Sequence, residues 1–227
     1  MKFQLAIIKV NKRSGGLVPR MYYIMSNIPT PLSNLAEIQL GRAFKTAVKD
    51  LGESGDASLI QIGDLNAGNA DKPHLLPSVK LEALDYKYIV ESGDILLPLR
   101  GAKIKAYIHE ITTDKPAITS NQVAIIKCRE QLSEPYFVCW YLNTPEVAHY
   151  IAKTNEGSNI QKLSGSLVRN LVINAPSIEI QRNIAAVYKN WLAQRAVHLK
   201  LIENGDVLFQ DVCKQALNGS VSVEHLI

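Results

Sequence analysis

The fold is decided at Leu171-Val172-Ile173-Asn174-Ala175-Pro176-Ser177-Ile178-Glu179-Ile180-Gln181-Arg182-Asn183-Ile184-Ala185, where a short apolar run meets a proline. The β-branched residues at its start predict a strand. Beyond Pro176, apolar residues recur at helical spacing almost to Leu217, and Asn218-Gly219 is a typical helix stop. This junction occurs once in the chain. It predicts a strand followed by a long C-terminal helix.

The predicted helix carries an apolar stripe that is longer than a small domain needs. The stripe begins with a 4-3-4 spacing from Ile180 to Trp191, as in a coiled coil, and then shifts by one residue. About 38 residues at 1.5 Å each would span roughly 57 Å. Asn204-Gly205 is a turn dipeptide within this pattern, so the sequence allows either one helix or a helical hairpin. The length and the two-sided stripe favour a protein partner over packing on the chain's own domain. The residues predicted to form this interface are Ile184, Val187, Trp191, Leu199, Ile202 and Phe209.

Upstream of the junction, most segments have the pattern of short strands. Two apolar segments at helical spacing, with a break at Thr144-Pro145, predict a pair of helices from Pro135 onward. A long loop is expected over 66–77 and a turn over 91–94. The predicted fold class is α+β: a β-rich domain with short helices, followed by a long C-terminal helix or helical hairpin. The expected strands are residues 59–62, 86–90, 95–99, 106–111, 121–127 and 171–173.

The composition is that of a globular chain. Its 227 residues are 47% hydrophobic and 20% charged, which suits one domain with an appendage or two small domains. No apolar run approaches the roughly 20 residues of a membrane-spanning helix, so we expect a soluble cytoplasmic protein. Cys128, Cys139 and Cys213 are too far apart for a zinc site and odd in number, which predicts reduced thiols.

The net charge of +4 does not by itself indicate a nucleic-acid partner. Residues 1–26 carry five basic groups and no acid, whereas residues 27–180 carry 15 basic and 17 acidic groups. The excess is therefore confined to the leader, and a body that binds DNA must do so through local patches. We expect a leader at 1–26, a domain at 27–178, a helical region at 179–219 and a tail at 220–227.

Four ordered segments resemble one family. They are 59–64 (L-I-Q-I-G-D), 92–101 (S-G-D-I-L-L-P-L-R-G), 135–142 (P-Y-F-V-C-W-Y-L) and 157–182, which ends in the proline, acid and glutamine of the junction. Their order and spacing are similar to the target-recognition domains of type I restriction–modification specificity subunits, over roughly residues 29–219. Ile180 separates Glu179 from Gln181, which departs from the adjacent acid and glutamine usual in that family.

The resemblance implies a function and a set of partners. In that family each recognition domain reads half of a split site on double-stranded DNA, and a long helix sets the spacing and docks the methyltransferase subunits. Most members have two domains and two helices, so one of each implies a half-length form that pairs with a second copy. The resemblance implies no catalysis or cofactor in this chain. S-adenosylmethionine and ATP would belong to the methyltransferase and to the restriction or translocase subunit.

Sequence reading needs amides and cations on projecting loops, with further cations for phosphates. Three stretches free of acids fit this requirement: 42–49, 95–109 and 157–178. We therefore predict a DNA surface from the polar residues of these stretches. The candidates are Arg42, Lys45, Arg100, Lys103, Lys105, Asn159, Gln161, Lys162 and Arg169.

Other functions have weaker signals. Asp85-Tyr86-Lys87, with Asp64 or Asp71 as an upstream acid, is the kind of triplet found in metal-dependent nucleases. Asn174-Ala175-Pro176-Ser177 is not the motif of an adenine methyltransferase, and the chain has no phosphate-binding P-loop. The remaining alternative is an interaction adaptor or orphan fragment that uses its helix without reading DNA.

Overall fold

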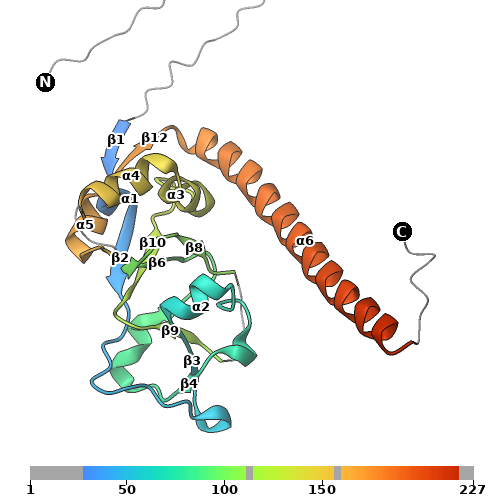
Figure 1. Cartoon of the computed structure of the whole chain (residues 1–227). Coiled ribbons are helices and arrows are strands. Elements are labelled where there is room, and N and C mark those ends of the chain that lie inside the picture. The colour runs from blue at the N-terminus through green and yellow to red at the C-terminus, as the bar shows by residue number, and fades with distance from the viewer. Residues whose placement is uncertain (1–27, 111–114, 156–159, 220–227) are drawn as a thin grey trace, which may run out of the picture.

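The computed structural model describes residues 28–110, 115–155 and 160–219. Two four-stranded sheets, two two-stranded ladders and several short helices form one body, from which a single long helix extends (Figure 1). The α+β prediction is confirmed, with one helix in place of a hairpin. Within the described residues, no helix combines the length and the apolar character needed to cross a membrane.

The central sheet has the strand order β2-β10-β6-β8, and its strands pair antiparallel. Both of its faces are covered, because alternate residues of β6 enter different cores. Ile95 and Leu97 pack on the side of the helices α3 and α4, and Leu96 packs on the other side. Strands at 95–99 and 121–127 were expected and lie here. The strands are β2 (Ala36–Leu40), β6 (Ile95–Pro98), β8 (Tyr107–Ile108) and β10 (Val123–Cys128).

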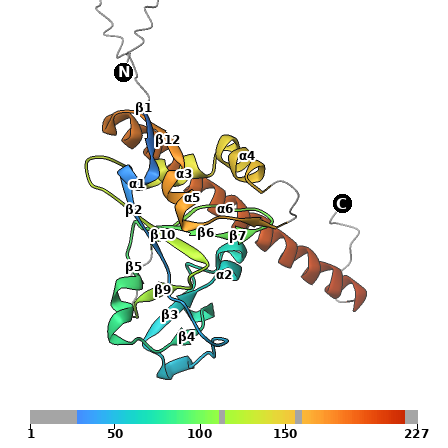
Figure 2. The ribbon, with the colours of Figure 1, turned by 90° about the vertical axis from the view of Figure 1, so that its left-hand side faces the viewer.

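A second sheet lies beside the first, with the order β4-β3-β9-β5 (Figure 2). Its two central strands run parallel, and the other pairings are antiparallel. The expected turn at 91–94 carries the chain from this sheet into β6, with the Asp94 N–H donating to the Glu91 carbonyl. The strands are β3 (Ala57–Ile60), β4 (Ser78–Val79), β5 (Ile89–Val90) and β9 (Ala117–Thr119).

Two strand predictions in this region were partly wrong, each for the same reason. The strand expected over 59–62 ends at Ile60, and α2 (Ile62–Ala67) begins because Asp64 accepts a hydrogen bond from the Gln61 N–H in a capping box. The strand expected over 86–90 is reduced to β5, because Ala83–Tyr88 forms a 3-10 helix with an equivalent capping box between Glu82 and Asp85. The loop expected over 66–77 also contains a 3-10 helix, Pro73–Leu75.

The predicted helix pair is confirmed as α3 (Pro135–Leu142) and α4 (Pro145–Lys153). A proline occupies the first turn of each helix. A backbone N–H at this position has no hydrogen-bond partner within the helix, so proline costs no helical hydrogen bond there. The Glu134 side chain caps α3 by accepting a hydrogen bond from the Phe137 N–H at 2.8 Å. Phe137, Val138 and Leu142 then bury one face of α3 against the central sheet.

The junction closes the body on itself. Strand β12 (Val172–Ala175) pairs antiparallel with β1 (Ile28–Pro31), so the first described residues lie next to the start of the long helix (Figure 1). Two short helices, α1 (Leu32–Leu35) and α5 (Gly165–Asn170), pack near this pair. Two further strands, β7 (Arg100–Gly101) and β11 (Gln161–Lys162), form a small ladder of their own.

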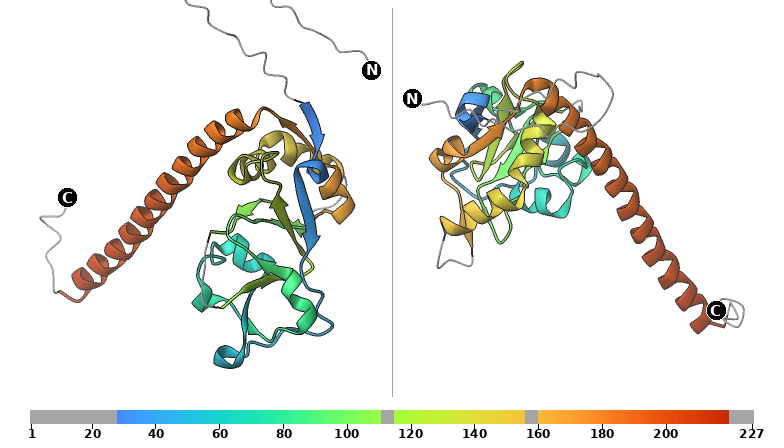
Figure 3. Two further views of the ribbon diagram at one scale, coloured as in Figure 1. Left: turned by 180° about the vertical axis from the view of Figure 1, so that it is seen from behind. Right: turned by 90° about the horizontal axis from the view of Figure 1, so that it is seen from above.

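The long helix α6 (Ile178–Leu217) has 40 residues and spans about 60 Å at 1.5 Å per residue. It continues through Asn204-Gly205 and ends at the expected stop. Its first turns pack on α3, where Ala185 is buried and Ile184 and Tyr188 cover the core. The rest of α6 leaves the body, which is clearest from behind and from above (Figure 3).

Candidate nucleic-acid interface

The β7–β11 ladder brings together two of the acid-free stretches predicted from the sequence. Lys162 lies directly opposite Arg100, and Gln161 lies opposite Gly101. The ladder is continued by a hydrogen bond from the Leu163 N–H to the Leu99 carbonyl at 2.7 Å. The side chains of Arg100 and Lys162 are exposed. Two cations that are distant in sequence are therefore held side by side on the surface.

Lys103 and Lys105 follow β7 and alternate with buried residues. Ile104 and Ala106 point into the core, so both lysine side chains remain exposed. Asn143, at the end of α3, fixes this segment through the backbone of Ala106. Its Oδ1 accepts from the Ala106 N–H at 2.9 Å, and its Nδ2 donates to the Ala106 carbonyl at 2.9 Å. The lysines are thus carried on a backbone that is tied to a helix.

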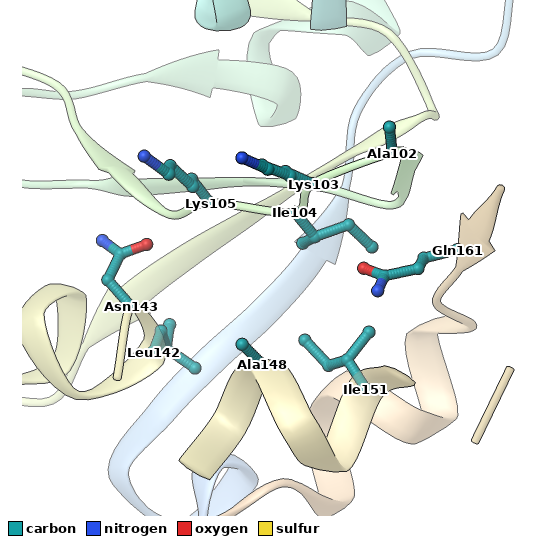
Figure 4. Close-up of a pocket in the computed structure, with 9 residues that line it drawn as sticks. All are labelled: Ala102, Lys103, Ile104, Lys105, Leu142, Asn143, Ala148, Ile151 and Gln161. Carbon is teal, nitrogen blue, oxygen red and sulfur yellow. The ribbon is translucent and has the colours of Figure 1, made fainter. Parts of the chain in front are cut away.

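A pocket with a volume of about 250 Å³ lies between this segment and α4 (Figure 4). Ile104 points from the segment between β7 and β8 toward Ala148 and Ile151 of α4, which gives the pocket an apolar floor. Lys103, Lys105 and Gln161 line its edge, so the pocket joins the segment of the two lysines to the β7–β11 ladder.

The positive charges of this surface have no acidic side chains paired with them in the described part of the chain. Within the described residues, the ion pairs lie elsewhere, and none of them involves Arg100, Lys103, Lys105 or Lys162. Like charges directly opposite each other on a ladder are destabilising. A surface of this kind suits an anion, and backbone phosphates are the anions that a DNA duplex presents.

The remaining DNA candidates lie in different surroundings. Lys45 is exposed in the loop after β2. Arg169, at the end of α5, is exposed, and its Nη2 donates to the Ile38 carbonyl at 3.3 Å. Asn159 lies outside the described residues. No local pattern separates these residues from the β7–β11 group, because their spatial relation depends on the tertiary fold.

Arg42 has internal partners. Its Nη1 lies 2.7 Å from Asp85 Oδ2 and donates to the Lys80 carbonyl at 2.8 Å, while its Nη2 lies 3.2 Å from Glu82 Oε1. The guanidinium also stacks over the Phe44 ring at 4.8 Å. Only 17% of the Arg42 side chain is exposed. This arrangement gives Arg42 a structural role between the second sheet and the 3-10 helix, apart from the β7–β11 group.

The same contacts bear on the nuclease hypothesis. The Asp85 carboxylate is buried and is shared between Arg42 and the Glu82 N–H, and Asp64 caps α2. In the part of the chain that the structure describes, no three His, Cys, Asp or Glu residues gather as metal ligands would. The positions of Asp85 and Asp64 are therefore explained by folding.

Gln181, which the sequence marked as part of the junction motif, fixes the start of α6. Its Oε1 accepts from the Glu134 N–H at 3.0 Å. Its Nε2 donates to the carbonyls of Pro176 at 3.0 Å and Leu132 at 3.2 Å. The side chain is almost completely buried. It therefore joins the proline turn, the cap of α3 and α6, and sets the direction in which α6 leaves the body.

The predicted interface residues of α6 fall into two groups. Ile184 packs against the body, as the alternative reading of the stripe expected. The other five are exposed, in a helix that carries ten large apolar side chains open to solvent. The five are Val187, Trp191, Leu199, Ile202 and Phe209.

A family model described as the type I restriction modification DNA specificity domain matches residues 29–203. A solved structure of the S subunit of the type I restriction–modification system from M. genitalium is 14% identical, with a TM-score of 0.55 over 86% of this chain and 47% of that chain. Another, described as showing complex assembly and conformational transition of the type I R-M system, is 17% identical, with a TM-score of 0.54 over 92% and 49%. The chain thus spans about half the length of these structures. No curated protein matches it in sequence.

Proposed function

The chain belongs to the type I restriction modification DNA specificity domain family, and we propose that it reads one half of a split site on double-stranded DNA. The observation that carries this proposal is the basic surface of Arg100, Lys103, Lys105 and Lys162, held rigidly by the β7–β11 ladder and by Asn143. Gln161 lies within this surface and has the amide that base-edge readout requires.

Different residues of this surface would do different things. The four cations would bind phosphates, which contributes affinity without sequence information. Gln161 within this surface, and Lys45 and Arg169 outside it, are the remaining polar candidates for base contacts. The domain at 27–178 would carry this reading, and the helical region at 179–219 would carry assembly.

The chain would act without catalysis of its own. S-adenosylmethionine and ATP would be used by the methyltransferase and by the restriction or translocase subunit, in the cytoplasm. The exposed apolar residues of α6 support docking of proteins along the helix. Val197, Leu201 and Leu208 lie within about 40° of one another around the helix at 3.6 residues per turn, and Ile202 and Phe209 lie on a neighbouring stripe. We assign one stripe to the methyltransferase and the other to a second copy of this chain.

The proposal is tested by mapping methylated bases in cells with and without the gene. Loss of methylation at one split sequence is the expected result. In vitro, the purified chain should select that sequence from a duplex library. The logarithm of its binding constant should fall linearly with the logarithm of the salt concentration.

The exposed helix also favours a second candidate, an interaction adaptor that does not read DNA. The two functions give opposite results in the same assays. An adaptor would leave the methylation pattern unchanged, and the purified chain would show no sequence-selective, salt-dependent binding to duplex DNA.

A further inference from the structure

The pocket beside the segment of the two lysines has a shape that phosphate binding does not explain. Ile104 lies opposite Ala148 and Ile151, so two apolar walls face each other across the pocket (Figure 4). Leu142 lines it at the end of α3. A phosphate is not stabilised by apolar walls, because a charge is costly to bury without partners. The pocket therefore suits an uncharged group that arrives with anions beside it.

The walls of the pocket are joined to one another by hydrogen bonds. Asn155, just after α4, accepts from the Lys162 N–H at 2.8 Å and donates to the Ile151 carbonyl at 2.9 Å. These two bonds connect the end of α4 to β11. Asn143 connects the end of α3 to the backbone of Ala106 in the same way. The pocket is thus formed before a ligand arrives, as binding sites for small groups mostly are.

The edge of the pocket is positive. Lys103 and Lys105 lie along it, and none of the described residues that line the pocket is acidic. Arg100 and Lys162 continue the positive surface on the neighbouring ladder. These cations attract anions to the edge. The amide of Gln161 offers both a donor and an acceptor to the polar edge of an uncharged group.

A nucleotide within a DNA strand has this combination of groups, because its uncharged flat base is flanked by two phosphates. The pocket volume of about 250 Å³ is below the roughly 300–1,000 Å³ of sites for drug-sized ligands, so it suits a single ring system. Proteins hold a base outside the helical stack between aromatic or apolar side chains, with hydrogen bonds to its polar edge. The two apolar walls and Gln161 meet these requirements.

A base that stays stacked in the duplex does not reach into this pocket. The edges of stacked bases lie at the floor of a groove, which is about 8.5 Å deep for the major groove, and the phosphates form its margins. When the lysines at the edge of the pocket bind phosphates, they hold the stacked bases away from its apolar walls. Only a nucleotide that is rotated out of the helix places its base on the protein side of its phosphates.

We infer that the pocket between Ile104 and α4 takes one extrahelical base of the bound DNA, with the flanking phosphates on Lys103 and Lys105. The inference rests on the duplex binding in the proposed function and adds a change in the conformation of the DNA. Extrusion costs least at a base that is already unpaired. The chain should therefore prefer a duplex that presents such a base.

Duplexes with one unpaired nucleotide test the inference directly. The probe is a short duplex of arbitrary sequence with a single bulged adenine at its centre. It is compared with the fully paired duplex and with the same duplex carrying an abasic residue in the bulge. In fluorescence anisotropy, we expect the bulged base to strengthen binding about tenfold over the paired duplex. The abasic bulge should bind like the paired duplex, because it bends the DNA equally but has no base to insert.

Two substitutions on α4 locate the effect. Ala148→Leu fills the pocket from an exposed position and should abolish the preference for the bulged base. Ala152→Leu adds the same side chain one turn later on the helix, at an exposed position that does not line the pocket, and should retain the preference. Circular dichroism and urea unfolding check that both variants are folded.

The outcomes separate the two proposals. Equal binding of the bulged and paired duplexes, equal binding of the bulged base and the abasic bulge, or a preference that survives Ala148→Leu overturns this inference and leaves the proposed reading of DNA intact. So does binding of a glutamate–leucine repeat peptide that Ala148→Leu abolishes, if the bulged base has no advantage, because the pocket would then be a protein site. A chain that binds none of these duplexes, and selects none from a duplex library, overturns both proposals.

Discussion

Arg100 and Lys162 face each other across the antiparallel β7–β11 ladder, at the spacing where like charges repel. The fold holds this pair in place through the neighbouring hydrogen bond between Leu163 and Leu99, and Lys103 and Lys105 extend the charge along the edge of the pocket. The repulsion is relieved when an anion lies between the cations. This relation makes the ladder the best place to test for phosphate binding.

Arg100→Ala and Lys162→Ala should each weaken binding to every duplex to a similar extent. Each should also reduce the slope of log affinity against log salt by about one, because one phosphate contact is lost. Stability in urea should be unchanged or slightly higher, since the repulsion is removed. Lys80→Ala is the control: it removes the same charge from a lysine that is paired with Asp56 beside the second sheet. Equal effects of all three substitutions would mean that only net charge matters.

Gln181→Leu should destabilise the chain by about 3 kcal/mol, because it leaves the Glu134 N–H and two carbonyls without partners in a buried place. Urea unfolding measures this loss. Gln194→Leu, an exposed change in the same helix, should have little effect. If Gln181→Leu were as stable as the wild type, the junction would not depend on these hydrogen bonds.

Arg42→Ala should cost about 3 kcal/mol, since it leaves the buried Asp85 carboxylate without its cation. The double substitution with Asp85→Ala should cost less than the sum of the two single ones, which a double-mutant cycle in urea detects. The salt dependence of duplex binding should not change. A reduced slope for Arg42→Ala would return this arginine to the DNA surface. When the chain is incubated with DNA and magnesium, we expect no DNA cleavage that depends on Asp85. The wild type and Asp85→Ala should therefore give the same result.

Alkaline pH should destabilise the chain. Burial raises the pKa of the Cys128 thiol to about 11, that of the Cys139 thiol to about 12, and that of the Tyr188 hydroxyl to about 12. These groups stay neutral in the folded chain while the unfolded chain ionises. Stability is therefore complete below pH 9 and is lost as the pH rises toward 11 to 12. Urea midpoints between pH 8 and 11 should fall, and Tyr188→Phe should reduce that fall.

Gly205→Ala should stabilise α6, because an added Cβ at Gly205 meets nothing within 4 Å and an interior helical glycine costs about 1 kcal/mol relative to alanine. Hydrogen exchange at the amides of 201–209 should slow accordingly. A helical hairpin at Asn204-Gly205 would show the opposite, with fast exchange at the turn and no protection from alanine.

Local signals were enough to predict α3, α4 and α6. Each begins at a proline or just after a proline turn, and α6 ends at Asn218-Gly219, so the chain around each end determines it. The strand expected over 59–62 ends early, at Ile60. The capping hydrogen bond from the Gln61 N–H to the Asp64 side chain starts a helix there, despite the β-branched residues that favour a strand. Side-chain hydrogen bonds of this kind decide boundaries that hydrophobic pattern alone leaves open.

The candidate site was predictable only in its parts. The acid-free stretches contained Arg100 and Lys162, but their pairing closes a loop of about sixty residues and has no local signal. Arg42 looked equivalent in sequence, and its acidic partners Glu82 and Asp85 lie some forty residues away. Nothing in the local sequence marks Asn143 either, because its role is to bind the backbone of a distant segment.

The pairing of β1 with β12 has a consequence for how such a protein changes its target. The points where the chain enters and leaves the body are adjacent, and Gln181 fixes α6 next to them. The segment from α1 to α5 therefore begins and ends at the same place, next to the β1–β12 pair. A different segment could replace it between β1 and β12, while α6 and whatever assembles along that helix stay in place. The part of the chain that selects the target and the helix along which partners assemble are thus free to evolve separately.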